Sequence, residues 1–198
     1  NIIKYGEKRS YLSPEQMFKE TAVYEAGYAV ISKILMPHVH IEHVSLTPND
    51  NATSFTSHNY NDVQDNMTIK DFKDKICVSL AGRTAQIKKF GLTDGMDTGA
   101  SNHLQQATRD AYAAIAHHGM DKDVGYININ GVIDAKENPA DTKHFHTKID
   151  TALESWLLEG EKNTTDLVNE HWEKIQKLST QLLEKEIIYE DELNEILA

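Results

Sequence analysis

The first quarter of the chain has the apolar spacing of a long helix. It begins with Ser13-Pro14-Glu15-Gln16, where serine can cap a helix, proline suits the first turn and glutamine follows the cap by three residues. Apolar and aromatic residues then recur at helical intervals, at Met17, Tyr24, Tyr28, Ile31 and Leu35. Because the residue before a proline disfavours helix, Pro37 marks the end. The pattern predicts a helix between Ser13 and Pro37.

The pattern then changes to short stretches that favour strands. Residues 43–47 alternate between polar and apolar, and residues 53–56 are rich in β-favouring types. Asn49-Asp50-Asn51 lies between them and has the chemistry of a turn. We therefore expect a small β-sheet near residues 43–57.

The rest of the chain returns to helical spacing. Expected helices cover residues 68–90, ended by Gly91, and residues 101–118, capped by Ser101 and closed by Gly119. Residues 121–143 have loop composition, and further helices are expected at 147–159, 164–185 and 191–197. The predicted fold is mainly α with a small sheet (α+β), as one domain over residues 13–198 preceded by a polar linker over residues 1–12.

The composition of the chain argues against several classes of function. The 198 residues can bury a core without disulfides or metal, and the net charge of −11 disfavours binding to nucleic acid or to anionic membrane surfaces. The single cysteine, Cys77, cannot form an intrachain disulfide. Apolar runs fall far short of the roughly 20 residues of a membrane span. The chain begins with Asn1 rather than methionine, and we expect it to be a piece of a longer protein.

One stretch of the first helix resembles the metal-binding helix of zinc proteases. Such helices carry His-Glu-x-x-His, in which two histidines one turn apart hold the metal and the glutamate is the base. Here Tyr24 and Tyr28 occupy the two histidine positions around Glu25.

The chain as a whole resembles the peptidase domain of FtsH-type AAA+ zinc metalloproteases. The stretches that carry the resemblance follow the order of the family motifs. TAVYEAGYA at 21–29 matches x-A-x-H-E-A-G-H-A, LAGR at 80–83 matches L-G-G-R, and TGASNHLQQAT at 98–108 matches T-G-A-S-N-D-x-x-x-A-T. Gly-Met at 119–120 comes next, and LLEKE at 182–186 followed by ELNEIL at 192–197 resembles the family's terminal motif. Several motifs in register make the resemblance specific over nearly the whole chain.

The resemblance implies a larger protein and a defined site. It implies an ATP-binding AAA+ domain before Asn1, a membrane anchor outside this chain with the domain in the cytoplasm, matrix or stroma, and a hexameric ring acting on unfolded or membrane proteins. In the family, zinc is held by the two histidines and by the aspartate of T-G-A-S-N-D. Those ligand positions correspond to Tyr24, Tyr28 and His103, and Glu25 keeps the position of the general base.

The departures from the family pattern fall on the metal ligands. A hydrolytic zinc site needs three suitable protein ligands and an open position for water. A phenol, with a pKa of about 10, would have to lose its proton to bind the metal, and one histidine alone holds zinc weakly. Without metal, Glu25 has no acidified water to activate. The sequence therefore predicts that this domain binds no zinc and is inactive as a peptidase.

A second departure lies on the strand that pairs with substrate in the family. That strand has the pattern P-R-G-x-A-L-G-Y-T, and here Asp50 and Ser54 replace its two glycines. The positions that correspond to the substrate-pairing strand are Ala52, Thr53, Ser54, Phe55 and Thr56. Backbone pairing with a peptide is possible at these positions but is no longer implied by the pattern.

Three interpretations remain open at this stage. In the first, Tyr24 and Tyr28 are core or cleft-wall aromatics, and the domain serves ring assembly or substrate handling. In the second, it is a working ATP-dependent zinc endopeptidase that uses His103 with unusual ligands. In the third, it is an adaptor subunit that joins active FtsH-type paralogues in mixed rings.

Overall fold

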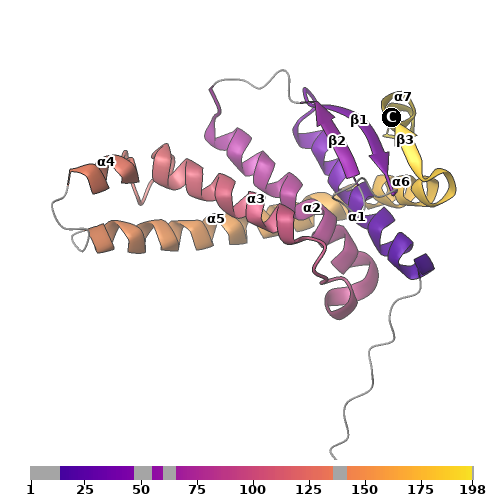
Figure 1. Cartoon of the computed structure of the whole chain (residues 1–198), viewed down its shortest axis with the longest axis horizontal. Coiled ribbons are helices and arrows are strands. Elements are labelled where there is room, and N and C mark those ends of the chain that lie inside the picture. Colours follow the sequence, from indigo (N-terminus) through magenta and orange to yellow (C-terminus); the bar gives the residue numbers. More distant parts are fainter. Residues whose placement is uncertain (1–13, 47–54, 60–65, 136–141, 198) are drawn as a thin grey trace, which may run out of the picture.

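The structure, a computed structural model, describes residues 14–46, 55–59, 66–135 and 142–197 (Figure 1). Its elements, in chain order, are α1 (Pro14–Leu35), β1 (His40–Ser45), β2 (Phe55–Asn59), α2 (Ile69–Asp94), α3 (Ser101–Tyr112), the π-helical turn η1 (Ala113–His117), α4 (Ile129–Asp134), α5 (Lys143–Glu170), α6 (Trp172–Lys185), β3 (Ile187–Tyr189) and α7 (Glu190–Leu197). The expected mainly α fold with a small sheet is confirmed. The proposed linker, residues 1–12, lies outside the described residues.

Helix α1 is buried on every side over its central part. Residues 22–32 are all buried, and α1 packs against both α2 and α6. Small residues allow this close packing: a Cβ on Gly27 would lie 2.6 Å from the Cβ of Ala85 on α2. Met17, which the helical pattern placed on the buried face, is instead 53% exposed, because the first turns of α1 extend beyond its neighbours.

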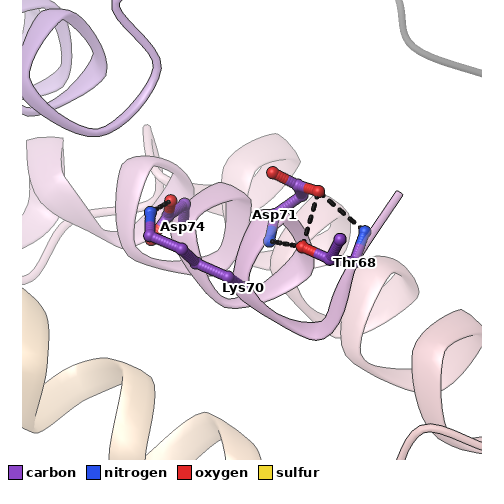
Figure 2. Close-up of polar contacts among 4 residues, drawn as sticks. All are labelled: Thr68, Lys70, Asp71 and Asp74. Atoms are coloured by element: carbon purple, nitrogen blue, oxygen red, sulfur yellow. Dashed lines mark hydrogen bonds and ion pairs between the residues drawn. The ribbon is translucent and has the colours of Figure 1, made fainter. Parts of the chain in front are cut away.

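Helix α2 begins with a capping box (Figure 2). The backbone N–H of Asp71 donates to Thr68 Oγ1 at 3.3 Å, and the backbone N–H of Thr68 donates to Asp71 Oδ2 at 2.7 Å. These bonds satisfy donors that a helix start leaves unpaired. The bond from the Thr68 backbone is the main reason why the pKa of Asp71 is lowered. The pair Lys70 and Asp74 follows on the exposed surface one turn later.

The structure ends α2 and α3 near the expected residues, but the residues that start and end these helices differ from the prediction. Gly91 interrupts the helix with φ +82°, as predicted, but the chain adds another turn that ends at Asp94. Ser101 was expected to cap α3, and this is wrong. The cap position is Ala100, without a side-chain hydrogen bond, and Ser101 is the first helical residue. The expected helix to residue 118 continues as the π-helical turn η1, and Gly119 follows with φ +61°.

The C-terminal boundaries are the main error of the sequence-based assignment. The predicted gap near residue 160 is absent, since α5 continues to Glu170 and the chain bends at His171 instead. Gly160 lies inside α5, where its missing side chain allows contact with α2: a Cβ there would be 2.7 Å from Ile76 Cγ2. The sequence analysis also missed the short helix α4 and the short strand β3.

The described sheet is antiparallel with the order β2-β1-β3. Ser45 pairs with Phe55 of β2 on one side and with Ile187 of β3 on the other. Figure 1 shows this sheet with α6 and α7 at one end of the molecule, and α4 at the other end beyond α3 and α5. One hydrophobic core joins α1 to the sheet and α6, and a second core joins α2 and α3 to α5. Helix α2 contributes to both cores and connects them.

Candidate functional site

The three residues that the resemblance places at metal-ligand positions meet between α1 and α3. Tyr24 and Tyr28 lie one turn apart on α1, and the α2–α3 hairpin returns His103, in the first turn of α3, to the same place. The Tyr24 hydroxyl is 2.5 Å from His103 Nδ1. This hydrogen bond joins residues that are 79 positions apart in the sequence.

The three side chains also stack through their rings. The His103 ring lies 4.5 Å from the Tyr28 ring, centroid to centroid, with the planes only 7° apart. It lies 5.6 Å from the Tyr24 ring with the planes 5° apart. Both tyrosines are more than nine-tenths buried. The imidazole of His103 is therefore engaged by its face as well as by its Nδ1.

A glycine on α2 makes room for the larger tyrosine ring. A Cβ built on Gly82 would lie 2.8 Å from three ring carbons of Tyr24. No side chain larger than hydrogen fits there without moving that ring. The absence of a side chain at Gly82 therefore accommodates the ring of Tyr24.

Burial and nearby charges keep the pair neutral. Burial raises the pKa of Tyr24 above its ordinary value, the carboxylates of Glu25 and Asp97 raise it further, and Arg83 opposes them. Burial also lowers the pKa of His103. Near neutral pH the phenol therefore keeps its proton and faces an uncharged imidazole, which suits donation from the hydroxyl to Nδ1.

Glu25, which the resemblance places at the position of the general base, is buried in α1 with only 4% of its surface exposed. Its carboxylate is one of the charges that raise the pKa of Tyr24.

The loop before α3 is tied to α1 and α2 by polar contacts. Asp97 Oδ1 accepts the backbone N–H of Gly99 at 2.8 Å. The side-chain amide of Gln86 donates to the Glu20 carbonyl at 3.2 Å and lies 3.4 Å from Asp97 Oδ2. These contacts position the start of α3, and hence His103.

The donor set at this site does not fit zinc. It consists of two phenols and one imidazole, and the nearer phenol is bonded to the imidazole and has a raised pKa. A phenol binds metal as phenolate, so a raised pKa works against ligation. Over residues 14–46, 55–59, 66–135 and 142–197, no group of three His, Cys, Asp or Glu side chains could hold a metal ion.

The candidate substrate strand is described only in part. Phe55 and Thr56 are the first residues of β2 and pair with Ser45 and Val44 of β1. Ala52, Thr53 and Ser54 lie outside the described residues. Within the described sheet β2 is an edge strand, and an edge strand can pair with a further backbone.

Tyr28 and His103 also line a cavity that the sequence did not indicate. The cavity has a volume of about 370 Å³, and α1, α2 and α3 all contribute to its wall. Its polar lining includes Lys75, Ser79, Gln106 and Asp110. Nothing in the spacing of these residues indicated that they share a cavity, because they come from two helices joined by a loop.

A known protein family matches almost the whole chain. The model of the peptidase family M41 matches residues 12–196. This chain therefore belongs to peptidase family M41.

Curated relatives carry the same family name. The chain is 28% identical to the rice (Oryza sativa subsp. japonica) "ATP-dependent zinc metalloprotease FTSH 8, mitochondrial" over 99% of its own length and 24% of the relative. It is 33% identical to "ATP-dependent zinc metalloprotease FtsH 1" of Alkaliphilus metalliredigens over 91% of its own length and 29% of the relative. It is 28% identical to the "ATP-dependent zinc metalloprotease FtsH" of Hahella chejuensis over 97% of its own length and 32% of the relative. The chain thus spans about a quarter to a third of the length of these relatives.

Proposed function

We propose that this domain is a proteolytically inactive peptidase-type domain of a membrane-anchored, ATP-dependent FtsH-like protein, in which it serves ring assembly or substrate handling. One observation carries the proposal: the three side chains at the family's zinc-ligand positions bind one another. The phenol of Tyr24 bonds the imidazole of His103, and Tyr28 stacks on the same ring.

The chemistry of this arrangement supports the loss of zinc hydrolysis. Zinc lowers the pKa of its bound water to about 7, and this supplies the nucleophile. Replacing that metal with a neutral phenol–imidazole pair leaves Glu25 without a water of that acidity. The fold is kept around the site, which supports a role that depends on shape and association rather than on bond cleavage.

Membrane attachment and ring assembly belong to the protein that contains this domain. No helix in the described part of the chain is long and apolar enough to cross a membrane. The relatives are named ATP-dependent, and an AAA+ domain that binds ATP would lie in the part of the relatives that this chain does not cover. An adaptor role in mixed rings with active paralogues is one form of the assembly function.

The test is zinc content together with proteolysis. We expect protein purified without chelator or affinity tag to contain close to zero zinc per chain by elemental mass spectrometry. We also expect no metal-dependent cleavage of casein. Such cleavage would stop on adding a chelator and would be absent in the Glu25→Gln variant. About one zinc per chain, lost in His103→Ala, together with such cleavage, would overturn the proposal in favour of an active endopeptidase with unusual ligands.

A further inference from the structure

Another cavity, which we call the α2–α3–α5 cavity, lies where these three helices pack together (Figure 1). Its volume is about 550 Å³, and leucine and isoleucine side chains from all three helices form most of its wall: Leu80, Ile87, Leu104, Leu153, Leu157 and Leu158. Leu158 is 59% exposed, and Met96, which lines the cavity from the loop between α2 and α3, is 48% exposed. The cavity therefore leaves apolar side chains in contact with water, and covering them with an apolar partner is favourable.

One edge of this cavity is acidic. Asp150, Glu154 and Glu161 line it from α5, and all three are exposed. Their spacing of four and seven residues puts them on one side of the helix, over about 16 Å of its length. Leu153 and Leu157 line the cavity from the same stretch of α5. Helix α5 therefore presents a row of carboxylates next to a row of leucines.

These carboxylates are not neutralised within the described part of the chain. None of the three forms an ion pair with a described residue. Arg83 of α2 also lines the cavity, but no nitrogen of Arg83 lies within 4.0 Å of a described carboxylate oxygen. Among the residues that line the cavity, three acids therefore face one base, and the α5 edge favours a cationic partner.

The walls favour a helix as that partner. They are themselves helices, whose backbone groups are paired internally, so an extended peptide would find no backbone partners there. A helix satisfies its own backbone, and about three turns of it match the acidic edge in length. A second copy of this chain is disfavoured as the occupant, because each copy carries a net charge of −11.

We propose that the α2–α3–α5 cavity docks an amphipathic helix of a partner protein. The apolar face of that helix covers the leucines, and lysine or arginine side chains along one edge meet the carboxylates of α5. This inference goes beyond the proposed function, because it assigns a partner to a surface that includes none of Tyr24, Tyr28 and His103.

The probe is a synthetic peptide of about 14 residues, held helical by a side-chain crosslink on its polar face. It has leucines on one face, lysines along one edge and glutamines elsewhere. In one matched peptide glutamates replace the lysines, and in another the same residues are reordered so that no apolar face forms. Fluorescence anisotropy at constant ionic strength measures binding. We expect saturable binding of the lysine peptide, at least tenfold tighter than that of either matched peptide.

Charge reversal tests the acidic edge. The combined variant Asp150→Lys, Glu154→Lys, Glu161→Lys changes only exposed side chains, so we expect it to fold. It should weaken binding of the lysine peptide at least tenfold and should bind the glutamate peptide more tightly than the wild type does.

A control variant of the same net charge separates local from overall electrostatics. Asp134→Lys, Glu184→Lys, Glu195→Lys reverses three exposed acids on α4, α6 and α7, none of which lines the cavity. We expect this variant to bind the lysine peptide much as the wild type does.

An exposed leucine tests the apolar wall without risk to the core. Leu158→Gln should weaken binding of the lysine peptide, because the peptide then covers a polar side chain instead of an apolar one. Leu183→Gln, at a 41% exposed leucine on α6, is the control and should leave binding unchanged.

Four results would overturn the proposal. Three of them are the absence of saturable binding, equal binding of the lysine peptide and a matched peptide, and unchanged affinity in the folded charge-reversed variant. The fourth is self-association in analytical ultracentrifugation that Leu158→Gln abolishes, which would make a second copy of the chain the occupant. None depends on zinc content or proteolysis, so a failure here is distinguishable from a failure of the proposed function.

Discussion

Tyr24 and His103 form a neutral hydrogen bond inside the protein, which we propose stands in place of metal ligation. Their bond, the stacking of Tyr28 on the same imidazole and the lack of a side chain on Gly82 beside Tyr24 explain how two tyrosines fit at the positions that we propose correspond to metal ligands. Burial disfavours charge on both partners of the bond, because a phenolate or an imidazolium would lose its hydration there. The hydrogen bond therefore contributes most to stability at pH values at which both rings are neutral.

We expect this neutrality to limit stability in alkaline solution. The pKa of Tyr24 is raised in the folded state above the value of about 10 for an unfolded chain, so its contribution is present below pH 10 and is lost as the pH rises further. The free energy of unfolding in urea should fall by about 1 kcal/mol more in the wild type than in Tyr24→Phe between pH 9 and pH 11. Tyr126→Phe, at a fully exposed phenol, is the control and should follow the wild type. Identical pH dependence in all three proteins would contradict the assignment.

At the scale of elements, contacts between helices override local preferences for helix ends. Glycine often marks the end of a helix, but α5 continues through Gly160. The missing side chain of Gly160 lets α5 approach Ile76 of α2. Gly91 also suggests a helix end from the sequence alone, and it does interrupt α2. Its φ of +82° is one that glycine adopts without strain. The two glycines show that the same residue marks a break or a close contact according to what packs against it.

Gly160→Ala tests this packing. Alanine favours a helix interior by about 1 kcal/mol relative to glycine, but overpacking a tight contact costs about 1–3 kcal/mol. With a Cβ only 2.7 Å from Ile76 Cγ2, we expect the contact to dominate and the free energy of unfolding to fall by about 1 kcal/mol. Gly131→Ala in α4, where a Cβ meets nothing within 4 Å, is the control and should be neutral or stabilising. Chemical denaturation measures both, and a more stable Gly160→Ala protein would refute the close approach.

At the scale of the molecule, the chain keeps the mainly α fold of family M41, and we propose that its metal chemistry is changed at three positions. Helix α1 carries two of those positions and is buried between α2 and α6, and the α2–α3 hairpin supplies the third. The framework that would hold metal ligands at these positions is therefore intact. This makes the change of ligands reversible in principle.

The triple variant Tyr24→His, Tyr28→His, His103→Asp should recover zinc binding. We expect close to one zinc per chain by elemental mass spectrometry and a zinc-dependent rise in the melting temperature, because a metal that binds only the folded state stabilises it. The double variant Tyr28→His, His103→Asp keeps Tyr24 and is the control, and it should bind zinc much more weakly. Failure of a folded triple variant to bind zinc would show that more than the ligands has changed.

The sequence by itself determined the mainly α character of the fold, the approximate positions of most helices and the family resemblance. These depend on local spacing and on the side-chain chemistry of Tyr24, Tyr28 and His103, which residues a few positions apart are enough to define. Tertiary structure decided what those residues do. The bond between Tyr24 and His103, the pairing of β3 with β1, the passage of α5 through Gly160 and the burial of Asp110 all join segments that are distant in the chain. Such contacts arise from the packing of whole helices and strands, and no local pattern encodes them.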